Sequence, residues 1–203
     1  MSKGRVEAFS DGVIAVAITL LALNLPLPNV ATPDLAGYLG LRWPSFAAFA
    51  VTFITIGIIW VNHHALMRRI KSVDTTVLFL NLMLLMTVCL LPFTTALMAL
   101  YLRAGSGENL AAAIWSGSFL LMGLAFVVIQ RHLMVVKPEL LTDGMTPAVR
   151  RAVLRRNAVG VMPYVVATAA AALSPYISLA ICAAVAIFYA LPATTEIDQR
   201  TAA

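Results

Sequence analysis

Charged and hydrogen-bonding side chains occur in this chain where a membrane helix is expected to be purely apolar. The segment RVEAFSDGVIAVAITLLALNLPLP, which begins at Arg5, carries Ser10 and Asp11 within its first two turns. A later apolar segment ends in WVNHH, from Trp60 to His64. A carboxylate in lipid is costly unless it is paired, faces the interior of a bundle or faces water. We therefore expect these residues to find partners among one another.

Composition indicates that the surrounding helices lie in a membrane. Of the 203 residues, 61% are hydrophobic and 11% are charged, and the mean hydropathy is +0.91. Soluble domains carry about 25% charged residues. Cys89 and Cys182 fall inside apolar runs, which favours packing roles over a disulfide or a metal pair. The usual metal, phosphate and dinucleotide motifs are missing, so we predict no cofactor, no metal site and no enzymatic activity.

Six apolar stretches approach the roughly 20 residues that a helix needs to cross a bilayer. They lie at residues 8–27, 46–62, 77–102, 110–130, 158–173 and 176–191. The last two are separated by Ser174 and Pro175, which predicts a tight helical hairpin. We predict an all-α integral membrane protein with a single domain over residues 1–203 and six transmembrane helices.

The distribution of basic residues predicts the orientation. Of the 14 Lys and Arg residues, all but Arg42 and Arg103 fall on the side of the N-terminus. The positive-inside rule makes that side cytoplasmic, and an even number of spans returns the C-terminus to it. The net charge of +5 is therefore a topology signal and not a nucleic-acid footprint. Residues 131–157 are predicted to form a cytoplasmic loop with a basic amphipathic helix from about Pro147 to Arg156.

Two alternatives concern the ends of these spans. The first span resembles a signal peptide with Lys3 and Arg5 as its charged region, but the apolar run is too long and Asp11 interrupts it. The charges near the second span could be interfacial anchors, with Trp60 in the aromatic belt. That interpretation suits Arg68, Arg69 and Lys71, but it does not suit Asp11, which is too short to reach the headgroups.

With this orientation three spans place polar groups at a similar depth near the cytoplasmic side. Asp11 lies at the start of the first span, WVNHH at the end of the second, and Asn81 about two turns into the third. Arg5, the Trp60 indole and one of His63 and His64 are the available donors for the carboxylate. We expect an internal hydrogen-bonded cluster. A metal site is not favoured, because adjacent histidines diverge by about 100° on a helix.

The rest of the first span carries an aliphatic stripe. Val16, Thr19, Leu20 and Leu23 recur at helical spacing, and three of them lie within about 60° of one another. By itself such a stripe is compatible with ordinary packing in a bundle.

The motifs of the first half of the chain resemble a known family. The R-x-x-x-F-S-D core at Arg5 to Asp11, the WVNHH segment, and LNLMLLMTVCLLPFTTALM with its L-P-F are similar to the prokaryotic members of the transmembrane protein 175 family of potassium channels. The resemblance covers about the first half of the chain at the level of motifs. The second half agrees in hydropathy and in helix count.

The resemblance implies a homotetramer of six-helix subunits in a bacterial inner membrane, with the first helix lining a central pore for K⁺. Apolar rings would then form the constriction at Val16, Leu20 and Leu23, with a hydroxyl ring at Thr19. The family more often has Ile or Leu at the first ring, so Val16 leaves a wider throat. A further set of residues would hold the first helix at its angle to the pore. These are Arg5, Phe9, Ser10, Asp11, Trp60, His63, His64 and, from its depth, Asn81.

Two other functions fit parts of the sequence. A proton-coupled secondary transporter could use Asp11 and a histidine as a relay. Against it, the last three spans carry almost no ionisable groups and no broken-helix pair is evident. A membrane enzyme using His63 or His64 would need a nucleophile or metal partner, and the sequence offers none at suitable spacing.

Overall fold

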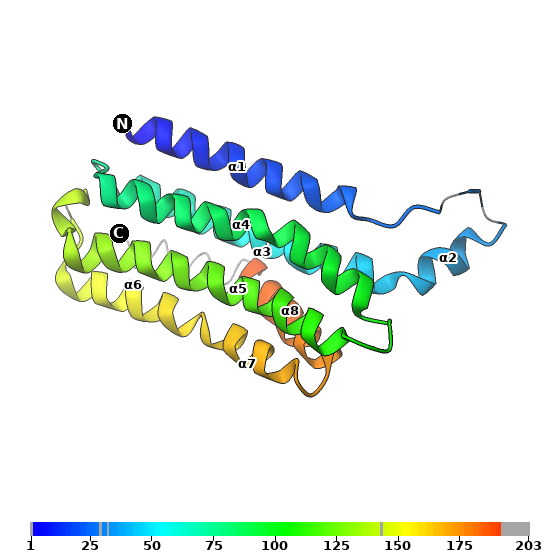
Figure 1. Ribbon diagram of the computed structural model, residues 1–203. Coiled ribbons are helices and arrows are strands. Elements are labelled where there is room, and N and C mark those ends of the chain that lie inside the picture. Colours follow the sequence, from blue (N-terminus) through cyan, green and yellow to red (C-terminus); the bar gives the residue numbers. More distant parts are fainter. Residues whose placement is uncertain (1, 29, 32, 143, 192–203) are drawn as a thin grey trace.

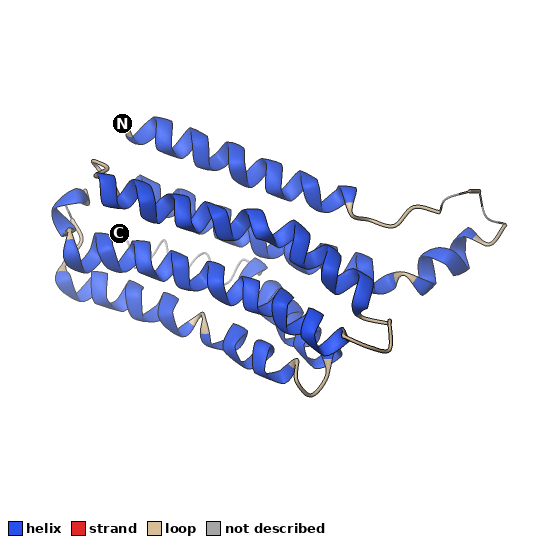
Figure 2. Ribbon diagram, in the orientation of Figure 1, coloured by secondary structure: helices blue, strands red, loops and turns tan. Residues whose placement is uncertain are grey.

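A computed structural model describes residues 2–28, 30–31, 33–142 and 144–191, and within these ranges the chain is built from helices (Figure 2). One isolated bridge joins Ile70 to Leu141. The elements are α1 (Lys3–Leu23), α2 (Leu35–Leu41), α3 (Trp43–Arg68), α4 (Thr75–Tyr101), α5 (Glu108–Arg131), a π-helical turn η1 (His132–Val136), a 3₁₀ turn η2 (Pro138–Leu140), α6 (Pro147–Val159), α7 (Met162–Ala170) and α8 (Pro175–Ala190).

The long helices lie side by side in a bundle, with α1 at one edge (Figure 1). α1 packs against α3 and α4, and α5 packs on the other side of α4. α7 and α8 contact each other and α5, while α6 and α7 lie at the edge opposite α1 (Figure 1). The chain therefore exposes one face of α1 to its surroundings at one edge and the α6–α7 segment at the other.

Four of the described helices are long and apolar enough to cross a membrane: α1, α3, α4 and α5, the last continued through η1 to Val136. α8 is apolar but shorter, with 16 residues. The protein is thus a membrane-embedded helical bundle, while the count of six spans and the cytoplasmic location of both termini stay predictions. Arg200 and the predicted cytoplasmic C-terminus lie outside the described residues.

Several helix boundaries differ from those expected from the apolar runs. α1 begins at Lys3 and ends at Leu23, where 8–27 was expected, and α3 extends from Trp43 to Arg68, where 46–62 was expected. A hydropathy window stops at the first charged residues, but backbone hydrogen bonding continues through them where the helix leaves the lipid. The region expected as 158–173 contains the end of α6, a break at Gly160 and Val161, and α7.

Local sequence explains the short elements of the second half. The predicted basic helix near Pro147 is present as α6, with Thr146 accepting a hydrogen bond from the Val149 amide and Pro147 in its first turn. The predicted hairpin is also present, with Ser174 preceding α8 and Pro175 at its first position. Glycine at position 107, with φ of 77°, supplies the left-handed residue that starts α5.

The buried core is centred on aromatic side chains of α5. Trp115 and Phe119 are completely buried, with ring centroids 4.8 Å apart in an edge-on arrangement. Tyr164 of α7 packs on Phe119 with centroids 5.8 Å apart. The Trp115 indole donates to the Thr52 hydroxyl oxygen at 3.1 Å, and Thr52 and Thr95 share a further hydrogen bond at 2.8 Å. This buried cluster, Thr52, Thr95 and Trp115, joins α3, α4 and α5.

Candidate functional site

The aliphatic stripe of α1 lies on the surface of the subunit. Val16 is 57% exposed, Leu20 43% and Leu23 79%, and Thr19 is exposed beside them. The Thr19 hydroxyl donates to the Val16 carbonyl oxygen at 2.8 Å, so its oxygen keeps lone pairs that point outward. These four residues share one helix face because they are three or four positions apart.

The opposite face of α1 is packed into the bundle. Ile14, Ala17 and Leu21 are each no more than 2% exposed and belong to the main core. On a helix with about 100° between successive residues, this set is centred well away from Val16 and Leu20. The aliphatic stripe is therefore not the face that α1 uses to pack on its own subunit.

Arg5 and Phe9 lie on the exposed face and not in the cluster to which the sequence assigned them. Both are exposed, Phe9 to 51%, and spacing places them in line with Val16. The Arg5 side chain makes no hydrogen bond or ion pair within the described part of the chain. Arg5 and Asp11 are six residues apart, which turns their side chains about 120° away from each other on a helix. Their opposite charges therefore do not bring them together.

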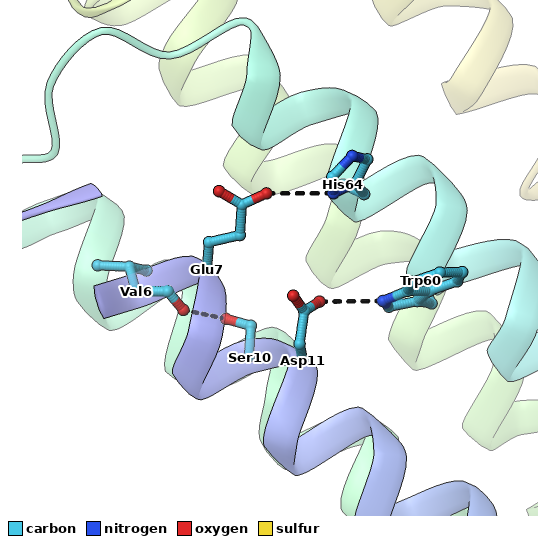
Figure 3. Close-up of polar contacts among 6 residues, drawn as sticks. All are labelled: Val6, Glu7, Ser10, Asp11, Trp60 and His64. Atoms are coloured by element: carbon cyan, nitrogen blue, oxygen red, sulfur yellow. Dashed lines mark hydrogen bonds and ion pairs between the residues drawn. The ribbon is translucent and has the colours of Figure 1, made fainter. Parts of the chain in front are cut away.

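Two parallel side-chain contacts tie the start of α1 to the end of α3 (Figure 3). The Trp60 indole donates to Asp11 Oδ1 at 2.9 Å, and His64 Nδ1 lies 3.1 Å from Glu7 Oε1. Glu7 and Asp11 are four residues apart on α1, as Trp60 and His64 are on α3, so the two contacts are one helical turn apart. We refer to Glu7, Asp11, Trp60 and His64 as the paired contacts.

The expected hydrogen bond between Asp11 and Trp60 is thus present. The exposed histidine, His64, contacts Glu7 and not Asp11. Sequence reasoning overlooked Glu7, which reads as an ordinary charge at a helix start. The matching four-residue spacings of Glu7 with Asp11 and of Trp60 with His64 are the signal that could have found it.

A second, fully buried set of contacts lies beneath the paired contacts. His63 Nε2 and Asn81 Oδ1 are 2.8 Å apart, and Asn81 Nδ2 donates to the Ser10 hydroxyl oxygen at 2.9 Å. The Ser10 hydroxyl in turn donates to the Val6 carbonyl oxygen at 2.8 Å, as drawn in Figure 3. Ser10, His63 and Asn81 are at most 1% exposed. This buried relay joins α1, α3 and α4, and it separates the two histidines: His63 enters the relay and His64 enters the paired contacts.

The other end of α1 has one polar attachment to α4. Asn24, which follows the last residue of α1, donates from Nδ2 to the Pro92 carbonyl oxygen at 3.3 Å. Between this contact and the buried relay, α1 is held by its apolar face. Among the described residues, no group of three or more His, Cys, Asp or Glu side chains is placed to hold a metal ion. The arrangement fixes the position of a helix and presents an aliphatic face, but it assembles no reactive group.

Comparison with known proteins shows the family to which this chain is related. A family model described as endosomal/lysosomal potassium channel TMEM175 matches residues 5–92, which include most of α1, all of α2 and α3, and most of α4. A protein of Streptomyces collinus that is named a potassium channel is 41% identical over 188 residues, covering 92% of this chain and 91% of its own. The chain belongs to the TMEM175 family. This confirms the resemblance drawn from the motifs.

Two further comparisons extend the likeness beyond the motifs. A Chamaesiphon minutus protein named a potassium channel is 36% identical over 191 residues, covering 93% of both chains. The crystal structure of a Chamaesiphon minutus homolog of the lysosomal potassium-selective channel TMEM175 matches with a TM-score of 0.77 at 34% identity and covers 93% of this chain and 96% of that one. The second half of the chain therefore shares the TMEM175 fold too. These relatives are named as channels and not as enzymes.

Proposed function

We propose that this chain forms a homotetrameric, potassium-permeable cation channel in a bacterial cell membrane, the inner membrane where two are present. The observation that carries the proposal is the asymmetry of α1. One face of this helix is packed against its own subunit, and the opposite face exposes Val16, Thr19, Leu20 and Leu23. The names of the relatives supply the permeant ion, K⁺, and the proposal requires no cofactor.

Several copies are needed because a single α1 cannot enclose a pathway. Around a shared axis the exposed stripes of neighbouring α1 helices would face one another. Ala8, Ala15 and Ala22 lie exposed on the flank of the stripe at seven-residue spacing. Small side chains at such positions allow close approach of neighbouring helices in a membrane. The number four comes from the family resemblance, and stoichiometry is part of the test.

The proposed constriction works by size and wetting. Rings of Val16, Leu20 and Leu23 would expel water when the pore is narrow and admit hydrated ions when it widens. Val16 is the smallest of the three side chains, so its ring would be the easiest to hydrate. The outward lone pairs of the Thr19 oxygen would give a passing cation a polar contact between the apolar rings.

In this proposal the paired contacts and the buried relay set the angle of α1. The bonds from Glu7, Ser10 and Asp11 all lie within the first turns of the helix, so they fix one end while the stripe lies further along. A shift of α1 against α3 and α4 would change the radius at Leu20 and Leu23 together.

The proposal is tested by potassium flux from liposomes containing the purified full-length protein. We expect wild-type protein to release K⁺ and the variants Leu20→Ala and Leu23→Ala to release it severalfold faster, because a wider apolar ring dewets less readily. Leu124→Ala is the matched control, since Leu124 is 46% exposed on α5 and lies outside the proposed pore. Its flux should equal that of the wild type.

Two results would overturn the proposal. One is the absence of K⁺ flux from both the wild type and the two α1 variants. The other is a native mass spectrum showing monomers or dimers in a detergent that preserves flux activity on reconstitution. Uptake that saturates and requires a pH gradient would instead support the proton-coupled transporter.

A further inference from the structure

A groove of about 790 Å³ lies at the edge of the bundle remote from α1, between the α6–α7 junction and α8. Val159, Pro163, Ile181, Val185 and Phe188 are among the apolar side chains that line it. Its volume is within the range of about 300–1,000 Å³ usual for sites that hold organic ligands. The groove is open at one side, and α1 makes no part of it. It is separate from the candidate pore.

The groove lies beside the break between α6 and α7, at Gly160 and Val161. Gly160 follows α6, and a Cβ added there would meet the Tyr189 hydroxyl at 2.7 Å, so the Tyr189 side chain of α8 packs closely on this junction. Since α6 and α7 are not one continuous helix, the junction leaves the apolar side chains of α8 uncovered. Ala184 and Phe188 are exposed along this edge.

Two arginines, Arg155 and Arg156, line the other end of the groove. Arg155 is exposed, and its side chain makes no hydrogen bond or ion pair within the described part of the chain. In the sequence, no acidic residue occurs between Asp143 and Glu196, while α6 alone carries four arginines. The region thus offers positive charge at one end of the groove and apolar surface at the other.

The depth of the arginines follows from their neighbour Asn157. Asn157 Nδ2 donates to Gln130 Oε1 at 2.9 Å, and Gln130 is followed by Arg131, the last residue of α5. α5 reaches its first polar and charged residues after its long apolar run, Gln130 and Arg131, at this level, and we place Arg155 and Arg156 at the same boundary of the hydrocarbon. Pro163 and Ile181 lie on the hydrocarbon side of the same groove.

We propose that this groove binds an anionic phospholipid from the leaflet on the side of the N-terminus. The lipid phosphate would contact Arg155 and Arg156, and an acyl chain would lie against Pro163, Ile181 and Val185. Basic pockets between membrane helices at the interface suit anionic headgroups. An apolar groove without its adjoining cations would accept any lipid, and cations without the groove would attract anions only diffusely, so the combination selects an anionic lipid.

Native mass spectrometry of the purified full-length protein in a non-ionic detergent tests this. The probes are phosphatidylglycerol and phosphatidylcholine with the same acyl chains, at equal concentrations. We expect preferential binding of phosphatidylglycerol, and about fivefold weaker binding in Arg155→Gln, as expected for one basic residue contributing about a factor of five at a membrane surface. Arg151→Gln, on the same helix but outside the groove, is the matched control and should bind as the wild type does.

A second pair of variants tests the apolar part. Ala184→Phe fills the groove and should reduce binding of both lipids, whereas Ala180→Phe, one turn away on α8 and outside the groove, should not. Equal affinity for the two headgroups, or equal effects of Arg155→Gln and Arg151→Gln, would overturn the proposal. Unchanged lipid binding by the Ala184→Phe variant would also overturn it. A change in the oligomer mass of this variant would overturn it too, because the groove would then be a contact between copies of the chain. The readout is independent of ion flux.

Discussion

Among the polar contacts that join helices of this bundle, two clusters are built from different kinds of residue. At the start of α1, the paired contacts and the buried relay use carboxylates, imidazoles and an amide. The second cluster, Thr52, Thr95 and Trp115, uses hydroxyls and an indole and involves no charged side chain. The titratable side chains of the paired contacts are partly exposed: that of His64 is 49% exposed and that of Glu7 is 24% exposed.

The difference follows from the cost of burying charge. A hydroxyl or indole that makes its hydrogen bonds can be buried in an apolar core at little cost, whereas an ionised group away from water carries a large desolvation penalty. Charged contacts therefore occur where α1 leaves the core, and neutral ones lie deeper. The first cluster also holds the helix proposed to line the pore, while the second joins α3, α4 and α5. We expect changes in the second cluster to affect stability alone and changes in the first to affect ion flux too.

The largest effect is expected for Trp115→Ala in the second cluster. Removing a completely buried indole leaves a cavity beside Phe119 and should lower the free energy of unfolding by about 3–5 kcal/mol. Thermal unfolding in detergent, followed by intrinsic fluorescence of the remaining tryptophans, measures it. Trp115→Phe is the control: it keeps a ring against Phe119 but loses the bond to Thr52, so it should cost about 1 kcal/mol.

The flux of any folded Trp115 variant should match that of the wild type per active molecule. A large change in flux with Trp115→Phe would show that the second cluster also controls the pore, and the proposed division between the two clusters would be wrong.

The next effect in size is expected for Asn81→Ala in the buried relay. His63 Nδ1 already lacks a partner among the described residues, so the loss of Asn81 leaves this buried imidazole with no side-chain hydrogen bond. The expected cost is about 1–3 kcal/mol in the free energy of unfolding. K⁺ flux should change as well, because the bond from Asn81 to Ser10 on α1 is lost.

The double variant His63→Leu with Asn81→Leu provides the control. Replacing both partners by apolar side chains removes the unpaired polar group, so the double variant should be more stable than Asn81→Ala. Its flux should nevertheless stay altered, since α1 has still lost the bond at Ser10. If the double variant regained both the stability and the K⁺ flux of the wild type, the buried relay would affect flux only by stabilising the fold.

Sequence reasoning succeeded where a residue type was out of place in its surroundings. Asp11 in an apolar run demanded a donor, and Trp60 is that donor. Thr52 and Trp115 gave no such signal, because threonine and tryptophan occur commonly in membrane helices without joining a cluster. Arg5 was assigned by its charge and by the R-x-x-x-F-S-D motif, although its separation of six residues from Asp11 already turned the two side chains apart.

The presence of the long helices could also be predicted from the sequence, but the residues at which they begin and end could not. Apolar runs located α1, α3, α4 and α5, since no other structure buries so many consecutive aliphatic residues. They could not show that α3 continues to Arg68, because hydropathy records lipid exposure and not backbone hydrogen bonding. The break between α6 and α7 did have a local signal, because Pro163 at the start of α7 cannot donate a backbone hydrogen bond to the preceding turn. The packing of the Tyr189 hydroxyl close to Gly160, 29 positions earlier in the chain, left no local pattern.

The smallest effect is expected for His64→Gln, which removes one of the paired contacts. The contact with Glu7 is partly exposed to water, and even with His64 protonated an exposed ion pair contributes about 0–1 kcal/mol. The neighbouring contact of Trp60 with Asp11 remains and should keep α1 in place. A double-mutant cycle of His64→Gln with Glu7→Gln, read by thermal unfolding and by K⁺ flux, measures the coupling. A coupling above about 2 kcal/mol would mean that this pair is shielded from water. The proposed contrast between titratable contacts near water and neutral contacts in the core would then be wrong.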